Sequence, residues 1–256
     1  EHSFPTRRSS DLHLGGAQAS SRAVITLQEF LSPGRLGNRP VDLVDLSVAI
    51  DAAATSVAAL APADNPMSAP GTTLSGLMVL RTTEGPYWLS FNVGDSRAYV
   101  VGGGGIRQLT HDHSALQEAR DLAATSGAPR VIPPANVVTK ALGAGQSGSV
   151  KADYTIMPLE EGDRAVICTD GVHGVLQDAQ IHAVVAAGDG PQGSADALVR
   201  ASLETGTRDN TTAVVVYAGT ESRVTLTTNV LNRMIQPVRP ASIQTARRVP
   251  RREGSN

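Results

Sequence analysis

Three aspartates stand where an apolar stretch of the sequence meets a loop. Asp95 follows the letters FNVG, Asp170 follows AVICT, and Asp209 precedes NTTAVVVY. If these stretches are strands of one core, their ends can bring the carboxylates together, and clustered carboxylates raise each other's pKa unless a hard cation such as Mg2+ or Mn2+ neutralises them. An Asp beside Gly or Asn is also a common turn residue, so the spacing alone leaves both interpretations open.

The apolar pattern predicts the elements that would position these aspartates. Helical spacing covers residues 16–31, 41–61, 114–126, 177–187 and 194–205, and strand-like stretches cover 72–81, 87–93, 98–101, 106–109, 163–169 and 211–217. We expect the first four strands to form an antiparallel meander. Strand runs interrupted by helix pairs indicate a layered α+β domain with antiparallel sheets.

Four segments in a fixed order resemble motifs of the metal-dependent serine/threonine protein phosphatase family of type 2C, in a bacterial form. They are VGDSRAY (93–99), QLTHDHS (108–114), CTDG (168–171) and RDNTT (208–212), with weaker matches at GTT (71–73) and VTKALG (138–143). Each segment is weak evidence by itself. Together, in order and at these intervals, they extend the resemblance over residues 14–218.

The resemblance implies a four-layer α-β-β-α sandwich whose two antiparallel sheets lack their N-terminal edge strands, with a metal cluster between the sheets. It implies that Asp170 and Asp209 bind a central pair of Mg2+ or Mn2+ ions and that Asp95 helps to bind a third ion. Hydrolysis in the family is direct, because a water shared by two metals attacks phosphorus. No catalytic side chain is therefore predicted beyond that water, and the substrate-binding residues stay open.

The N-terminus departs from the family pattern. Members carry a phosphate-gripping Arg, an acidic ligand, and an Asp-Gly-x-Gly-Gly segment whose Asp bridges both metals, of which only Leu14-Gly15-Gly16 remains. Leu12 takes the bridging Asp position and His13 the first Gly position, which removes a charge and an oxygen ligand. Gly174 falls where many members carry an Asp for the third metal.

The first residues of the chain show no periodicity of a helix or a strand. Residues 4–12, FPTRRSSDL, resemble the conceptual translation of a sequencing-adapter oligonucleotide. We interpret residues 1–13 as a non-native sequence scar in front of a truncated domain. A genuine disordered N-terminus is the alternative.

Other residues of the motifs are assigned structural roles. Arg97 is expected to anchor loops. His111 and His113 could act as acids, but we expect Asp112 or Ser114 to cap the following helix and the histidines to pack or bond locally. The single cysteine, Cys168, lies in an apolar run and is expected to be a buried, inert thiol.

Charge and composition limit the partners. Residues 221–256 carry seven Arg against two Glu, which leaves 15 basic against 22 acidic residues in 1–220, a net charge of −7. An acidic body with 3% aromatic residues suits cations better than nucleic acid.

No apolar run approaches the roughly 20 residues of a membrane-spanning helix. We expect a cytoplasmic monomer with phosphoprotein substrates, a Ser/Thr kinase counterpart and a flexible basic tail at 219–256.

Two interpretations of the activity follow. The leading one is a phosphatase that removes phosphate from Ser and Thr, represented here by a truncated domain impaired by the loss of its N-terminal ligands. The alternative is a pseudophosphatase, a module that binds a kinase or a phosphoprotein without hydrolysis. Retention of Asp95, Asp170 and Asp209 favours the first, whereas Leu12, if native, favours the second. A nucleic-acid adaptor built on the basic tail ranks below both.

Overall fold

The structure, a computed structural model, describes most of the chain between residues 15 and 219. The described ranges are 7–8, 15–37, 39–65, 68–126, 132–145, 150–219 and 243–245, with the backbone alone at 7–8 and 243–245. Leu12, His13 and the seven arginines of the basic tail lie outside the described residues, so the predictions for a scar and for a flexible tail stay predictions.

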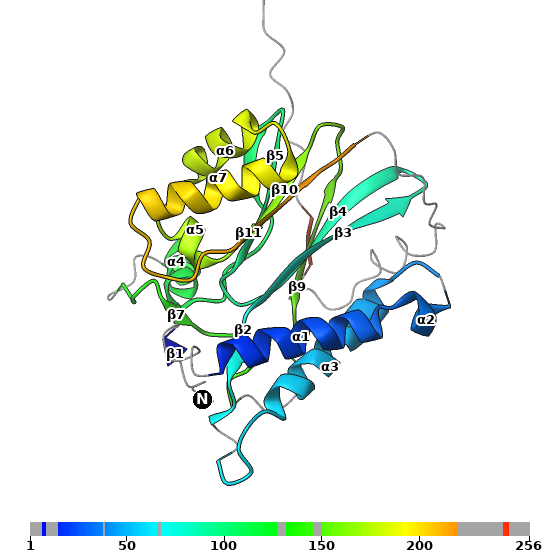
Figure 1. Ribbon diagram of the computed structural model, residues 1–256, viewed down its shortest axis with the longest axis vertical. Coiled ribbons are helices and arrows are strands. Elements are labelled where there is room, and N and C mark those ends of the chain that lie inside the picture. The colour runs from blue at the N-terminus through cyan, green and yellow to red at the C-terminus, as the bar shows by residue number, and fades with distance from the viewer. Residues whose placement is uncertain are drawn as a thin grey trace, which may run out of the picture.

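Two four-stranded sheets face each other, and helices cover their outer sides (Figure 1). The first sheet has the order β12-β9-β4-β3, formed by Ile243–Thr245, Asp153–Pro158, Gly85–Val93 and Leu74–Thr82. The second has the order β11-β10-β5-β6, formed by Ala213–Tyr217, Arg164–Cys168, Arg97–Gly102 and Gly105–Gln108. Two short antiparallel pairs join β1 (Arg7–Arg8) to β7 (Val137–Val138) and β2 (Gly71–Thr72) to β8 (Leu142–Gly143).

Helices of the N-terminal half pack on the first sheet and those of the C-terminal half on the second (Figure 1). The first group is α1 (Gly16–Phe30), α2 (Pro33–Leu36) and α3 (Leu43–Ala58). The second is α5 (Asp170–His173), α6 (Asp178–Ala187) and α7 (Pro191–Glu204), while α4 (Ala115–Ser126) lies next to β7. None of the described helices has the length and apolar character that crossing a membrane requires.

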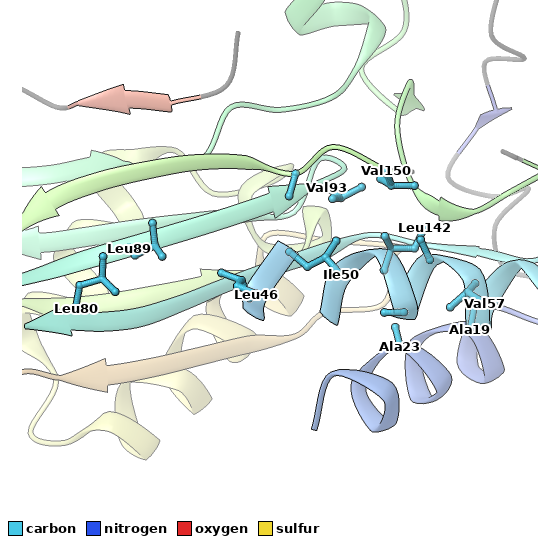
Figure 2. Packing of buried hydrophobic residues seen from close by; sticks show 13 residues of the cluster. Ala19, Ala23, Leu46, Ile50, Val57, Leu80, Leu89, Val93, Leu142 and Val150 are labelled. Atoms are coloured by element: carbon cyan, nitrogen blue, oxygen red, sulfur yellow. The ribbon is translucent and has the colours of Figure 1, made fainter. Parts of the chain in front are cut away.

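Three apolar clusters hold these layers together. The first contains Ala23 of α1, Ile50 of α3 and Leu89 of β4, and Figure 2 shows α3 with Ile50 between Ala23 and the strands. Small alanines on α1 let the two helices approach closely, and the larger side chains of α3 fill the space beneath the sheet. The second cluster joins the other sheet to α6 and α7, and the third, around Trp88 and Val100, lies between the sheets. The predicted α-β-β-α sandwich is thereby confirmed, and its sheets are antiparallel except for the short β12, which pairs with β9 in parallel.

The predicted meander of four strands is wrong. β3 and β4 form an antiparallel hairpin of the first sheet, whereas β5 and β6 belong to the second. The chain changes sheet at Gly94–Ser96, directly after β4, because β5 pairs with β10 and places Tyr99 and Val101 in the cluster of the second sheet. Asp95 therefore lies at a crossing between the two sheets. The sequence prediction also missed β9, which pairs with β4 along Tyr87–Asn92.

One side of the sandwich leaves inter-sheet side chains partly exposed. β11 and β3 are the outer strands there, and β3 lies against β10. Val216 pairs with Ala165 of the inter-sheet cluster but is 45% exposed, and Val214 on the same face is 49% exposed. Val79 of β3 is 39% exposed. The described residues thus leave apolar surface uncovered along this edge.

A buried hydrogen bond connects the sheets across the middle layer. Trp88 Nε1 of β4 donates to Asp163 Oδ2 at 3.0 Å, just before β10. The same oxygen accepts from the Glu160 N–H at 2.9 Å, and Asp163 is 5% exposed. Burial of this carboxylate depends on both donors, since an unsatisfied buried acceptor is costly.

We expect Trp88→Phe to lower the free energy of unfolding by at least about 1 to 2 kcal/mol, because Asp163 loses a buried donor although an aromatic ring still fills most of the site. Urea unfolding followed by circular dichroism measures this change. Tyr87→Phe is the matched control, since it removes only an exposed contact to Glu84, and it should change stability by less than about 0.5 kcal/mol. Equal effects of the two substitutions would contradict the role of the cross-sheet bond.

Candidate metal centre

Thr169 joins the loop that carries Asp170 to the loop that carries Asp209. Its N–H donates to the Thr212 carbonyl at 3.1 Å, and its Oγ1 accepts from the Thr212 N–H at 3.1 Å. The Thr169 hydroxyl also donates to the carbonyl of Asn210 at 3.1 Å. Each predicted ligand is the direct neighbour of one of these residues. The pairing of β10 with β11 is thus extended past the strand ends, and Asp170 and Asp209 lie on adjoining loops.

Gly171 permits this close approach of the two loops. A Cβ atom at this position would lie 2.4 Å from the Asn210 carbonyl oxygen and 2.7 Å from Thr211 Oγ1. Any side chain would therefore separate the start of α5 from the loop before β11. In the CTDG segment, Asp170 supplies a carboxylate and Gly171 supplies the small residue that the close approach of the two loops requires.

The turn that carries Asp95 is tied to α5 and to the segment before β3. Gly94 has φ of 112°, and a Cβ there would lie 2.4 Å from Thr73 Cγ2, so both conformation and space require glycine. Ser96 Oγ hydrogen-bonds Thr73 Oγ1 at 2.8 Å. On the other side, the ring of His173 is 2.9 Å from the Asp95 carbonyl.

His173 is a residue that the sequence analysis missed. Burial, together with the positive charge of Arg97, lowers its pKa to about 4, so the ring is neutral and its Nε2–H donates to the Asp95 carbonyl. It lies three residues after Asp170 on α5, on the same side of that short helix. The spacing of three residues from Asp170 was the only sequence signal for His173. A single histidine at that spacing is too common to mark a functional residue.

The Asp95 carboxyl is buried beside a second carboxylate. Its side chain is 7% exposed, and burial followed by the negative charge of Asp170 raises its pKa to about 7. A carboxyl whose pKa is raised by burial and by a neighbouring carboxylate is in an arrangement that a hard cation stabilises. The donor set is made of oxygen atoms, so these residues fit Mg2+ or Mn2+ better than a softer metal.

Arg97 has the structural role expected for it. Its guanidinium donates to both carboxylate oxygens of Asp112, with the shortest contact 2.7 Å from Nη2 to Oδ2, and Nη1 donates to Tyr99 OH at 3.1 Å. Asp112 is 6% exposed. This ion pair anchors the segment after Asp95 to the segment before α4.

The remaining motif residues also bond locally. Ser114 Oγ accepts from the Gln117 N–H at 3.2 Å and so caps α4, whereas Asp112 is occupied by Arg97. His111 Nε2 lies 2.8 Å from the exposed Asp121. His113 bonds to Gly94. Burial raises the pKa of Cys168 to about 12, in agreement with an inert thiol.

The described residues form only part of a metal-binding group. Asp95 and Asp170 interact, while Asp209 lies on the adjoining loop and is partly exposed. Within the described ranges, no three His, Cys, Asp or Glu residues gather closely enough to hold a metal ion. Gly174 supplies no carboxylate, and a Cβ there would lie 2.5 Å from the Asp170 carbonyl oxygen. The position of the expected bridging Asp, Leu12, lies outside the described residues.

Known proteins share this sequence pattern. A family model described as protein phosphatase 2C matches residues 10–205. The serine/threonine phosphatase stp of Listeria innocua is 29% identical over 126 residues, 49% of this chain and 49% of that protein. The protein phosphatase PhpP of Streptococcus pneumoniae is 27% identical over 152 residues, 59% of each. The chain spans about half the length of the first of these relatives.

Solved structures share the fold. The phosphatase MsPP from Mycobacterium smegmatis, in complex with cacodylate, is 29% identical with a TM-score of 0.62, covering 80% of this chain and 84% of that one. The catalytic domain of the serine/threonine phosphatase PstP, in complex with two manganese ions, is 25% identical with a TM-score of 0.62, covering 82% and 83%.

We expect Asp95→Asn to stabilise the metal-free protein at pH 8. Because the pKa of Asp95 in the folded protein lies above the ordinary value of 3.8, the stability linked to this group is complete below about pH 4 and is lost as the pH rises to about 7. The rise corresponds to a gain on the order of 4 kcal/mol for the neutral amide. Urea unfolding in EDTA at pH 4 and pH 8 measures it.

The exposed Asp64 gives the control for this measurement. Asp64→Asn should leave the pH dependence of unfolding unchanged. If Asp95→Asn also leaves it unchanged, the carboxyl of Asp95 does not carry the electrostatic cost assigned to it.

Arg97→Met should destabilise the protein by about 3 to 5 kcal/mol, because it leaves the buried Asp112 carboxylate without its ion-pair partner. In the double variant Arg97→Met with Asp112→Leu, much of this loss should be recovered. A double-mutant cycle from urea unfolding measures the coupling. Additive effects of the two substitutions would contradict the assigned role of the pair.

Proposed function

The chain belongs to the protein phosphatase 2C family, and from that premise we propose that it carries most of a phosphatase domain that hydrolyses phosphoserine and phosphothreonine on proteins. The observation that carries the proposal is the pair formed by Asp95 and Asp170. These carboxylates come from the first and the third of the four motif segments, Asp95 from the turn after β4 and Asp170 from the start of α5, and they interact where the chain crosses between the two sheets. A cation site would explain a carboxyl buried next to another one, because the bound cation offsets the electrostatic cost of the pair.

We assign the ligand roles by motif and by position. Asp170 and Asp209 would hold a central pair of ions and Asp95 would help to hold a third. When bound, Mg2+ or Mn2+ would supply Lewis-acid chemistry and lower the pKa of water for attack on phosphorus. The two manganese ions of the PstP structure support this choice.

The chain's own contribution is to fix the oxygen atoms. Thr169 holds the loops of Asp170 and Asp209 together, and His173 holds the Asp95 turn against α5. In the proposed reaction a water oxygen bonds to phosphorus, the bond from phosphorus to the Ser or Thr oxygen breaks, and the leaving oxygen takes a proton. No nucleophilic side chain is needed, which agrees with a buried Cys168 whose pKa is raised to about 12.

We further propose that the intact domain has strands beside β11 and β3. The support is the exposure of Val214, Val216 and Val79 on faces that otherwise lie between the sheets. Unpaired strand edges with apolar side chains favour pairing with another strand. Such strands would also bring the missing Arg, acidic and Asp-Gly residues toward Asp170, as the family resemblance implies.

A pseudophosphatase is the second candidate function. It is favoured by the incomplete group of ligands within the described residues. A module of this kind would bind a phosphoprotein or its kinase through the same sandwich without hydrolysis. The two candidates differ in what happens when the missing ligands are supplied.

We expect that Leu12→Asp with His13→Gly, placed behind two N-terminal strands of a relative, will give Mn2+-dependent hydrolysis of p-nitrophenyl phosphate. Asp170→Asn in that extended protein should lower kcat/KM by at least about 100-fold, since loss of a residue that only supports a ligand already costs 10- to 100-fold. Activity is followed by release of p-nitrophenolate, with EDTA as the metal-free reference.

Exposed Asp196→Asn on α7 is the control for this substitution and should keep full activity. An extended protein that folds and binds Mn2+ but does not hydrolyse the ester would contradict the phosphatase proposal. That outcome would favour the pseudophosphatase.

A further inference from the structure

His113 holds both polar backbone groups of the residue before Asp95. The His113 N–H donates to the Gly94 carbonyl at 2.9 Å, and the Gly94 N–H donates to His113 Nδ1 at 2.9 Å. The carbonyl of His113 accepts from the Thr139 N–H at 2.9 Å, which fixes His113 itself. The imidazole is buried, with 7% of the residue exposed.

The hydrogen bond to Gly94 determines which nitrogen of His113 carries the proton. A backbone N–H can only donate, so Nδ1 has to present its lone pair, and the proton of the neutral ring is on Nε2. Asp153 Oδ2 lies 3.1 Å from Nε2 and is the acceptor for that proton. Asp153 begins β9, the strand beside β4 (Figure 1).

Lys140 completes this arrangement. Its Nζ lies 3.0 Å from His113 Nε2, 3.6 Å from Asp153 Oδ1 and 3.1 Å from the carbonyl of Lys151. An ammonium group has only donors, so with Nε2 protonated its partners are the carboxylate and the carbonyl. Lys140 thereby keeps Asp153 charged and oriented as the acceptor for His113.

We propose that His113 is a positioning residue for the cation site at Asp95, held in its acceptor tautomer by Asp153 and Lys140. The role rests on the proposed function, because it requires Asp95 to be a ligand. Gly94 has a positive φ at the point where the chain leaves β4, so the orientation of its peptide groups decides where the Asp95 carboxylate points. The histidine fixes these groups from one side, and His173 fixes the Asp95 carbonyl from the other.

His113 differs in this from its neighbour in the motif. His111 is partly exposed, and its ring pairs with Asp121 of α4. The two histidines of the THDHS segment therefore form a matched pair for experiment. One bonds the turn of a candidate ligand, and the other bonds a surface helix.

The test is Mn2+ affinity of the 256-residue chain, measured from the EPR signal of free Mn2+. His113→Ala should weaken binding by about 10- to 100-fold, as for other residues that orient metal ligands. His113→Asn should retain affinity close to that of the unchanged protein, because Asn Oδ1 can accept the Gly94 N–H from nearly the position of Nδ1. His111→Ala should bind like the unchanged protein.

A second measurement gives the tautomer directly and requires no metal. The 15N shifts of the imidazole nitrogens in metal-free protein should identify His113 as the Nε2–H form. A ring with the proton on Nδ1, or with both nitrogens protonated at pH 7.5, would overturn the proposal. This measurement uses the unchanged sequence and is independent of whether His113→Ala folds.

The outcomes separate this proposal from the function on which it rests. If the unchanged chain binds Mn2+ and folded His113→Ala binds it equally well, the positioning role is wrong and the metal site stands. Loss of affinity in His113→Asn equal to that in His113→Ala would likewise contradict the hydrogen-bond role. If the unchanged chain does not bind Mn2+, both the metal site and the role of His113 in this chain are contradicted.

Discussion

The burial of the Asp95 carboxyl beside Asp170 is the constraint on which the arrangement of this molecule depends. A carboxylate removed from water next to another one is unfavourable unless a cation or a dense set of donors compensates it. The chain places Asp95 at the crossing from one sheet to the other, where it is 7% exposed. Glycine at 94, the Thr73–Ser96 hydrogen bond and the His173 contact all act on the turn around it. Such restraint opposes relaxation of the turn and keeps the carboxyl available to a ligand.

The described residues include contacts that hold the loops of the candidate ligands. Thr169 connects the two C-terminal loops, and the ion pair of Arg97 and Asp112 connects the two central segments. Each of these contacts joins residues from the same motifs that carry the aspartates. The motifs are therefore packed against one another: residues next to an Asp in one motif form hydrogen bonds to the loop of another motif. The candidate site can therefore be recognised from these contacts, although the position of the expected bridging ligand, Leu12, lies outside the described residues.

Sequence reasoning predicted much of this fold, and its failures have physical causes. The helices around Ala23 and Ile50 follow from the apolar period, and the predicted strands are present because aromatic residues in β4 and β-branched residues in β10 and β11 favour extended backbone. The change of sheet at Gly94 was not predicted, because a tight turn after a strand gives the same local signal whether the chain forms a hairpin or crosses to another layer. β9 was missed for a related reason, since a short strand with mixed polar residues gains its stability from pairing with β4.

The candidate site was predictable in part. The role of Arg97 and the cap at Ser114 follow from local chemistry, and the structure confirms both. His173 could not be identified in advance, because its importance comes from contact with a turn 78 residues earlier in the sequence. The proximity of Asp95 and Asp170 likewise depends on packing between layers. Periodicity and spacing describe single elements, whereas these contacts arise where elements of both sheets meet.

The location of bound metal is the most direct test of whether these loops form a cation site. Crystals grown with Mn2+ and measured on both sides of the manganese absorption edge would give the positions of the ions without reference to activity. We expect anomalous density in contact with carboxylate oxygens of Asp95 or Asp170, on the side that faces the Asp209 loop. Ordered Mn2+ found only elsewhere on the molecule, with Asp95 and Asp170 free of it, would contradict the central claim that these loops form a cation site.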